Sequence, residues 1–171
     1  MVQEGLEMNL VLLITLLMAP TPNRDLAKDE DMRDDLSIHI GTTAVLHGLD
    51  PVLLTFWAYG ESSLDQSKIG ARKEVGVMQA KGIARALCEA RDLDVAGDYR
   101  DSLECGAWLI HAGMLHCGRG RDDEGRPRTA LERGLAWYAS GKCRGTPMAW
   151  RAVDKRRKQA ELWNKRKQLF W

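Results

Sequence analysis

The chain has 171 residues, a formal net charge of +1, a hydrophobic fraction of 44% and a charged fraction of 29%. This length and composition are typical of one soluble domain that can bury its own core, and the total charge gives no reason to expect a polyanionic partner. The charge is uneven along the chain, however, because residues 25–35 hold six acids and residues 151–167 hold eight bases.

Residues 1–20 include the most apolar stretch of the chain, residues 8–18, within a predicted helix over residues 2–18 that ends before Pro20. Eleven residues, of which Asn9 and Thr15 are polar, are too few to span a bilayer as a helix, which needs about 20. The length suits the core of a signal peptide, but the preceding residues are acidic and include no Lys or Arg. Two interpretations stay open: a helix that docks on the domain or on a partner, and a targeting segment.

Residues 21–33 are predicted to be an acidic linker, and residues 34–171 to be the folded domain. The boundary lies at residue 34 because Asp34 or Asp35 can cap the first helix of the domain.

The rest of the chain shows helical hydrophobic periods separated by capping and turn residues. The predicted helices cover residues 34–47, 51–62, 78–89, 99–117 and 129–138, followed by a basic helix from 146 to the C-terminus. A polar loop is predicted over residues 63–75, and a flexible, Gly-rich charged loop over residues 118–128. The sequence holds no convincing strand, so the predicted fold class is all-α.

The helix over residues 51–62 is apolar nearly all round, which is typical of a helix at the centre of a domain. Asp50 and Pro51 are predicted to start it, and Glu61 lies at its end. A carboxylate at this place costs free energy unless a partner satisfies it or a reaction uses it. Burial there would favour the protonated form of Glu61, so we expect this residue to act as an acid.

Four cysteines, at positions 88, 105, 117 and 143, show no CxxC pair and no Cys/His spacing typical of zinc. They allow three disulfide pairings, among which the sequence does not choose. Buried free thiols are the alternative. Oxidised cysteines would indicate an extracytoplasmic or virion setting.

Three blocks of sequence occur in a fixed order. Glu61-Ser62 follows a lead-in at residues 48–51 (Gly-Leu-Asp-Pro), residues 76–79 (Gly-Val-Met-Gln) come next, and Tyr138 follows late in the chain. Over about residues 34–163 this ordered set resembles the soluble lytic transglycosylase (SLT) family of lysozyme-like muramidases.

The resemblance implies a lysozyme-like all-α fold and cleavage of the β-1,4 bond between N-acetylmuramic acid and N-acetylglucosamine in peptidoglycan, with no cofactor and no metal. Glu61 would be the sole catalytic acid and base: it protonates the leaving oxygen and then activates the muramoyl 6-hydroxyl, which closes a 1,6-anhydro ring. Asp65, the nearest candidate for a second carboxylate, lies in the polar loop.

The substrate-binding residues that the resemblance implies are Ser62, Met78, Gln79 and Tyr138. Ser62 would form hydrogen bonds near the acid or with the substrate's peptide, Met78 would supply an apolar wall, and Gln79 would line the sugar cleft. The Tyr138 hydroxyl would orient the acid. The alternatives are a core methionine at Met78 and a core tyrosine at Tyr138. Ala139 replaces the asparagine of the family, which points to a weakened or narrowed activity.

Other functions remain open. The chain could be a hydrolysing lysozyme, or a structural or wall-binding component of a phage tail or secretion assembly that binds a protein partner through residues 1–20 or the C-terminal helix. The bases at 151–167 could contact anionic wall polymers, membrane phosphates or an acidic protein. No nucleic acid is expected, because no recognition motif is present. The expected location is periplasmic, extracytoplasmic or virion-associated.

Overall fold

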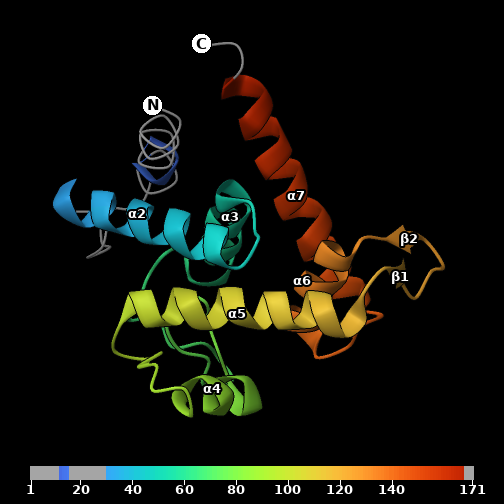
Figure 1. Ribbon diagram of the computed structural model, residues 1–171, viewed down its shortest axis with the longest axis horizontal. Helices are drawn as coiled ribbons and strands as arrows, with labels where there is room; N and C mark the ends of the chain where they lie inside the picture. The colour runs from blue at the N-terminus through green and yellow to red at the C-terminus, as the bar shows by residue number, and fades with distance from the viewer. Residues whose placement is uncertain (1–11, 16–29, 168–171) are drawn as a thin grey trace. The chain divides into compact units, whose positions relative to one another are not determined.

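The computed structural model describes residues 12–15 and 30–167, and most of these residues are helical (Figure 1). The predicted helical class is therefore confirmed for the described residues. The elements are α2 (Glu30–Leu46), α3 (Pro51–Ser62), α4 (Gly82–Glu89), α5 (Tyr99–Cys117), β1 (Gly120–Arg121), β2 (Pro127–Arg128), α6 (Ala130–Ser140) and α7 (Pro147–Lys167). Of the helix predicted over residues 2–18, residues 12–15 are helical and the others lie outside the described residues. None of the described helices has the length and apolar character to cross a membrane.

The chain divides into two compact units, residues 1–105 and 106–171, and the division falls within α5. Each unit holds one disulfide: Cys88 bonds to Cys105 in the first, and Cys117 bonds to Cys143 in the second. None of the four cysteines is free, so the free-thiol alternative is wrong for this structure.

The central helix α3 has the bounds that the sequence predicts. The Asp50 carboxylate accepts the backbone N–H groups of Val52 and Leu53 at 2.7 and 3.1 Å, and Pro51 occupies the first turn. Ser63 ends the helix in the left-handed conformation (φ 65°) and donates its N–H to Tyr59 O. All residues from 52 to 58 are buried, which explains why this helix is apolar on every side.

Helix α2 begins at Glu30, four residues before the predicted boundary, so the linker prediction for residues 30–33 is wrong. Asp35 is not a cap, because α2 begins five residues before it; its carboxylate accepts hydrogen bonds from the Tyr99 hydroxyl and the Arg100 guanidinium. A contact 64 residues away in the chain leaves no local signal in the sequence. Helix α2 packs on α3.

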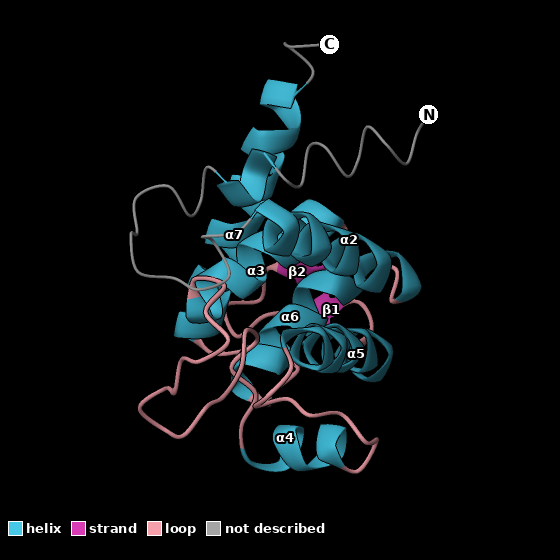
Figure 2. Cartoon of the chain, turned by 90° about the vertical axis from the view of Figure 1, so that its left-hand side faces the viewer, coloured by secondary structure: helices cyan, strands magenta, loops and turns pink. Residues whose placement is uncertain are grey.

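Helix α4 begins at Gly82 rather than at Met78 as predicted. The reason is a tight turn: Val75 and Ala80 exchange both backbone hydrogen bonds at 3.0 Å, and Gly76 and Gln79 have positive φ angles of 75° and 54°. Figure 2 shows the long loop that joins α3 to this helix. The turn therefore belongs to the loop and not to the helix.

The loop predicted over residues 118–128 contains an antiparallel hairpin, β1 with β2, so the prediction of a flexible loop is wrong. The Asp122 side chain is its organising group, because it accepts the backbone N–H groups of Glu124 and Arg126 and the guanidinium groups of Arg126 and Arg128. Short strands held by a charged side chain lack the alternating pattern by which strands are predicted.

Helices α6 and α7 begin where the sequence predicts and pack on each other. Thr129 and Glu132 form a capping box at the start of α6, and Gly141 ends it in the left-handed conformation (φ 71°). The side chain of Arg128 joins the hairpin to both helices: it forms ion pairs with Glu132 and Asp154 and lies 4.4 Å from the Trp150 ring centroid.

Candidate active site

Glu61 lies in the last turn of α3, where the buried helix reaches a loop. The residue is half-buried, whereas the preceding residues 52–58 are buried. Its carbonyl oxygen accepts a hydrogen bond from Lys68 Nζ at 2.8 Å. This ammonium group lies at the negative end of the helix, where a cation stabilises the unpaired carbonyls.

Ser62 is 1% exposed, and its hydroxyl is used within the protein. It donates to Ala58 O at 3.3 Å and accepts the Asp65 N–H at 3.1 Å. The Asp65 carboxylate in turn accepts the backbone N–H and the hydroxyl of Ser67, at 2.9 and 2.7 Å. Ser62 and Asp65 therefore hold the chain reversal that follows the acid.

Gln79 connects the turn at residues 76–79 to the loop that follows Glu61. Its side-chain amide donates to Lys68 O and to Gly76 O, both at 2.9 Å. Lys68 is thus held by its carbonyl oxygen to Gln79 and by its ammonium group to Glu61. Two of the blocks that carry the family resemblance are linked through one residue.

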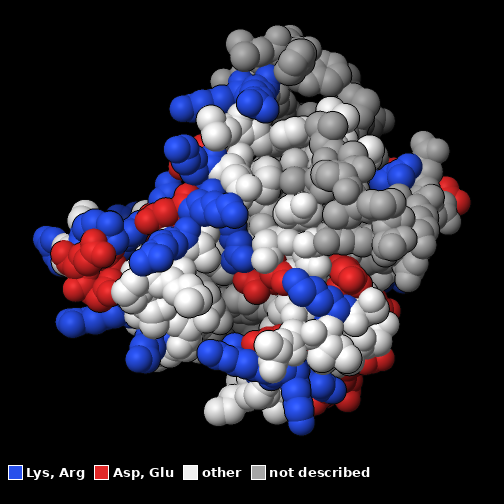
Figure 3. Space-filling view, turned by 180° about the vertical axis from the view of Figure 1, so that it is seen from behind, with Lys and Arg blue, Asp and Glu red and all other residues white. Residues whose placement is uncertain are grey.

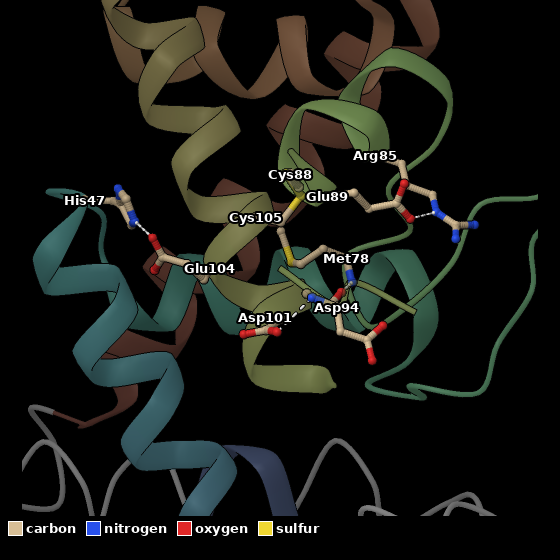
Figure 4. Close-up of a disulfide and its surroundings, with 10 residues drawn as sticks. His47, Met78, Arg85, Cys88, Glu89, Asp94, Asp101, Glu104 and Cys105 are labelled. Atoms are coloured by element: carbon tan, nitrogen blue, oxygen red, sulfur yellow. Dashed lines mark hydrogen bonds and ion pairs between the residues drawn. A yellow bond between two sulfur atoms is a disulfide. The ribbon is translucent and has the colours of Figure 1, made fainter. Parts of the chain in front are cut away.

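Met78 is fully buried, and its backbone N–H donates to the buried Ser102 hydroxyl at 3.1 Å. Figure 4 shows Met78 with the Cys88–Cys105 disulfide, which joins α4 to α5. The burial agrees with the core methionine that the sequence left as an alternative.

Gly76 is required by the same turn. It has a φ of +75°, and a Cβ atom there would collide with Val95 O and the Ser102 hydroxyl. This backbone approach lets Ser102 reach the Met78 N–H.

Sequence reasoning missed two residues, Gln66 and Lys68. Gln66 accepts the Val77 N–H at 3.0 Å through its side-chain oxygen and donates to Val95 O and Ala96 O at 3.1 and 3.0 Å. Neither residue belongs to a motif, so the sequence indicated only that both lie in a polar loop.

Tyr138 belongs to the second unit, on α6, and is half-buried. Gly134, one turn earlier, lies against Ile110 O and Met114, and Ser140 Oγ donates to Ala136 O at 2.6 Å. The structure thus groups Glu61, Ser62, Met78 and Gln79 in the first unit and Tyr138 in the second.

The carboxyl groups of the loop differ in their environment. Burial raises the pKa of Glu74, but hydrogen bonds from its own backbone, from Arg72 N–H and from Lys81 outweigh this effect and lower it. Glu74 is therefore ionised, and its carboxylate forms an ion pair with Lys81 Nζ at 3.1 Å. It is not a candidate proton donor.

One group of potential metal ligands occurs among the described residues: His116, Cys117 and Cys143 lie within 4.8 Å of one another. The two cysteines are bonded to each other, so neither offers a thiolate to a metal. This group is a disulfide with a neighbouring histidine.

Comparison of the chain with protein-family models, with curated proteins and with solved structures finds no match.

Proposed function

We propose that this protein is a peptidoglycan lytic transglycosylase with a lysozyme-like fold and with Glu61 as its sole catalytic acid and base. One observation carries the proposal: Gln79 holds Lys68, and Lys68 holds the carbonyl of Glu61. The end of the buried helix and the turn at residues 76–79 are therefore joined by two hydrogen bonds through Lys68. These are the two blocks that a sugar cleft of this family would require.

In the proposed reaction, protonated Glu61 donates its proton to the glycosidic oxygen, and the bond between that oxygen and the muramoyl C1 breaks. The resulting carboxylate accepts the proton of the muramoyl 6-hydroxyl, whose oxygen bonds to C1 and closes the 1,6-anhydro ring. The proton count of Glu61 is restored, and no water is consumed. A single carboxylate is sufficient for this reaction. This agrees with the Asp65 carboxylate, which already accepts two hydrogen bonds from Ser67.

The other residues have supporting roles in this proposal. Ser62 fixes the chain reversal behind the acid, Met78 supports the turn from the core, and Gln79 fixes the turn to the loop. Gln79 is half-buried, and we propose that it is the member of this group that touches a sugar. Tyr138 is proposed to orient the acid through its hydroxyl.

An extracytoplasmic or virion location fits the proposed substrate. Its support is the pair of disulfides, because such bonds form and persist in oxidising compartments.

The test is digestion of purified murein with the full chain, followed by mass spectrometry of the muropeptides. The proposal expects 1,6-anhydro ends, a loss of at least about a thousandfold in rate for Glu61→Gln, and near-normal rate for the control Glu89→Gln, since Glu89 is an exposed partner of Arg85. Reducing ends would identify a hydrolysing lysozyme. If the folded protein gives no product, the wall-binding or assembly function is the one that remains.

A further inference from the structure

The solvent-facing side of α7 carries a row of cations that we call the basic stripe. It consists of Arg151, Lys155, Lys158, Lys165 and Arg166, all exposed. At 100° per residue these five positions fall within an arc of roughly 100°, on the side opposite the buried Ala149, Val153 and Ala160. The row is therefore one continuous face of the helix.

The basic stripe has no charge partner among the residues that the structure describes. Within residues 12–15 and 30–167, none of the five side chains forms an ion pair or hydrogen bond. The acids of α7 are engaged elsewhere: Asp154 pairs with Arg128 at 2.6 Å, and Glu161 pairs with Arg157 at 3.0 Å. Figure 3 shows Lys and Arg side chains on one face of the molecule, with Asp and Glu side chains among them.

Two large apolar side chains interrupt the row. Met148 is 80% exposed and Leu162 is 47% exposed, and both fall within the same arc. A soluble polyanion would gain little from them. A bilayer surface offers phosphate groups for the cations and acyl chains for the apolar groups, and a helix of 21 residues, about 30 Å long, matches a flat surface.

We propose that α7 docks in the plane of an anionic phospholipid surface, with the basic stripe on the headgroups and with Met148 and Leu162 inserted between them. This surface goes beyond the proposed activity, and its test measures binding alone. Each basic residue near an anionic leaflet is worth about a fivefold change in partition, and the effect weakens as salt screens it.

The experiment is sedimentation of the full chain with vesicles of phosphatidylglycerol and phosphatidylcholine, and with vesicles of phosphatidylcholine alone. The variant Lys155→Gln/Lys158→Gln/Lys165→Gln removes three charges of the basic stripe. The control Arg119→Gln/Lys142→Gln/Arg144→Gln removes three exposed charges of the second unit that lie outside α7. We expect binding to the anionic vesicles only, a loss of roughly 100-fold for the stripe variant and less than about fivefold for the control.

A third variant, Met148→Ser/Leu162→Ser, separates insertion from simple charge attraction. We expect it to weaken vesicle binding without changing the dependence on salt. Three outcomes would overturn the proposal: no binding to anionic vesicles, equal losses in the stripe variant and the control, or binding to duplex DNA or polyphosphate as tight as to vesicles with no effect of the serine substitutions. Circular dichroism confirms that the variants are folded, and a salt titration of the unaltered protein measures the charge dependence without any substitution.

Discussion

The Lys68 ammonium nitrogen lies 2.8 Å from the carbonyl oxygen of Glu61, at the end of the buried helix α3. Lys68 is itself held by its backbone carbonyl to the Gln79 amide at 2.9 Å. A loop residue outside every motif thereby connects the proposed acid to the turn that would hold the sugar. This relationship gives the first prediction.

Replacing Lys68 by Met should lower the rate of murein cleavage by roughly tenfold to 100-fold, because a small misplacement of the acid is costly in rate. The melting temperature should change by only a few degrees, since the hydrogen bond is exposed. Lys68→Arg, which keeps a donor and the charge, should retain more of the rate. Equal rates for Lys68→Met and the unaltered protein would show that the loop contact has no part in catalysis.

Gly76→Ala should destabilise the first unit by about 3 kcal/mol or more. The substitution requires a strained φ of +75° and places a Cβ against backbone and Ser102. Gly48→Ala is the matched control, because Gly48 has a similar φ of +65° but no atom within 4 Å of the added carbon. Its expected cost is about 1 kcal/mol. Urea unfolding measures both, and equal costs would mean that the turn can move away from Ser102.

Ser102→Ala should reduce the free energy of unfolding by about 1–3 kcal/mol, because it leaves the buried Met78 N–H without an acceptor. Ser67→Ala removes a hydroxyl whose hydrogen bond to Asp65 is exposed, and should cost less than about 1 kcal/mol. Chemical denaturation of the two variants checks the difference. A neutral Ser102→Ala would indicate that another group or a water molecule satisfies the N–H.

Loss of the Cys88–Cys105 disulfide should release α4 from α5, because Cys88 is the only buried residue of α4. In the chain-entropy relation, sequence separations of 17 and 26 residues predict about 3 kcal/mol for this bond and about 3.5 kcal/mol for Cys117–Cys143. Hydrogen exchange of each double Cys→Ala variant should therefore show loss of protection near residues 82–89 only for the first pair. If the amides of α4 remain protected from exchange in the variant that lacks Cys88–Cys105, the exposed face of α4 must pack on another part of the protein.

Acid should weaken the hairpin of the second unit. Burial raises the pKa of the Asp122 carboxyl, but hydrogen bonds from the Arg126 side chain and backbone and from Arg128 outweigh this effect and lower the pKa to about 2. The folded-state pKa lies below the unfolded value of 3.8, so the stabilisation is present above about pH 4 and is lost as the pH falls through 2. Asp122→Asn should remove this part of the pH dependence, as measured by thermal unfolding between pH 2 and 5. An unchanged pH profile would assign the acid sensitivity to other carboxylates.

The sequence determined those parts of this protein that depend on neighbouring residues. Helix α3 has the predicted bounds because its caps, Asp50 and Ser63, act within a few residues. The same holds for the start of α6, where Thr129 and Glu132 form a local capping box. Glu61 could be selected for the same reason, because an acid at the end of an apolar run is visible in the sequence alone.

Only the tertiary structure decided what depends on distant contacts. Asp35 of α2 accepts hydrogen bonds from Tyr99 and Arg100, and Ser102 fixes the turn at Met78. The pairing of the four cysteines was likewise undetermined, since the chain must fold before two thiols meet. The physical reason is common to all of these: a hydrogen bond or disulfide between residues far apart in the chain leaves no period or spacing in the sequence.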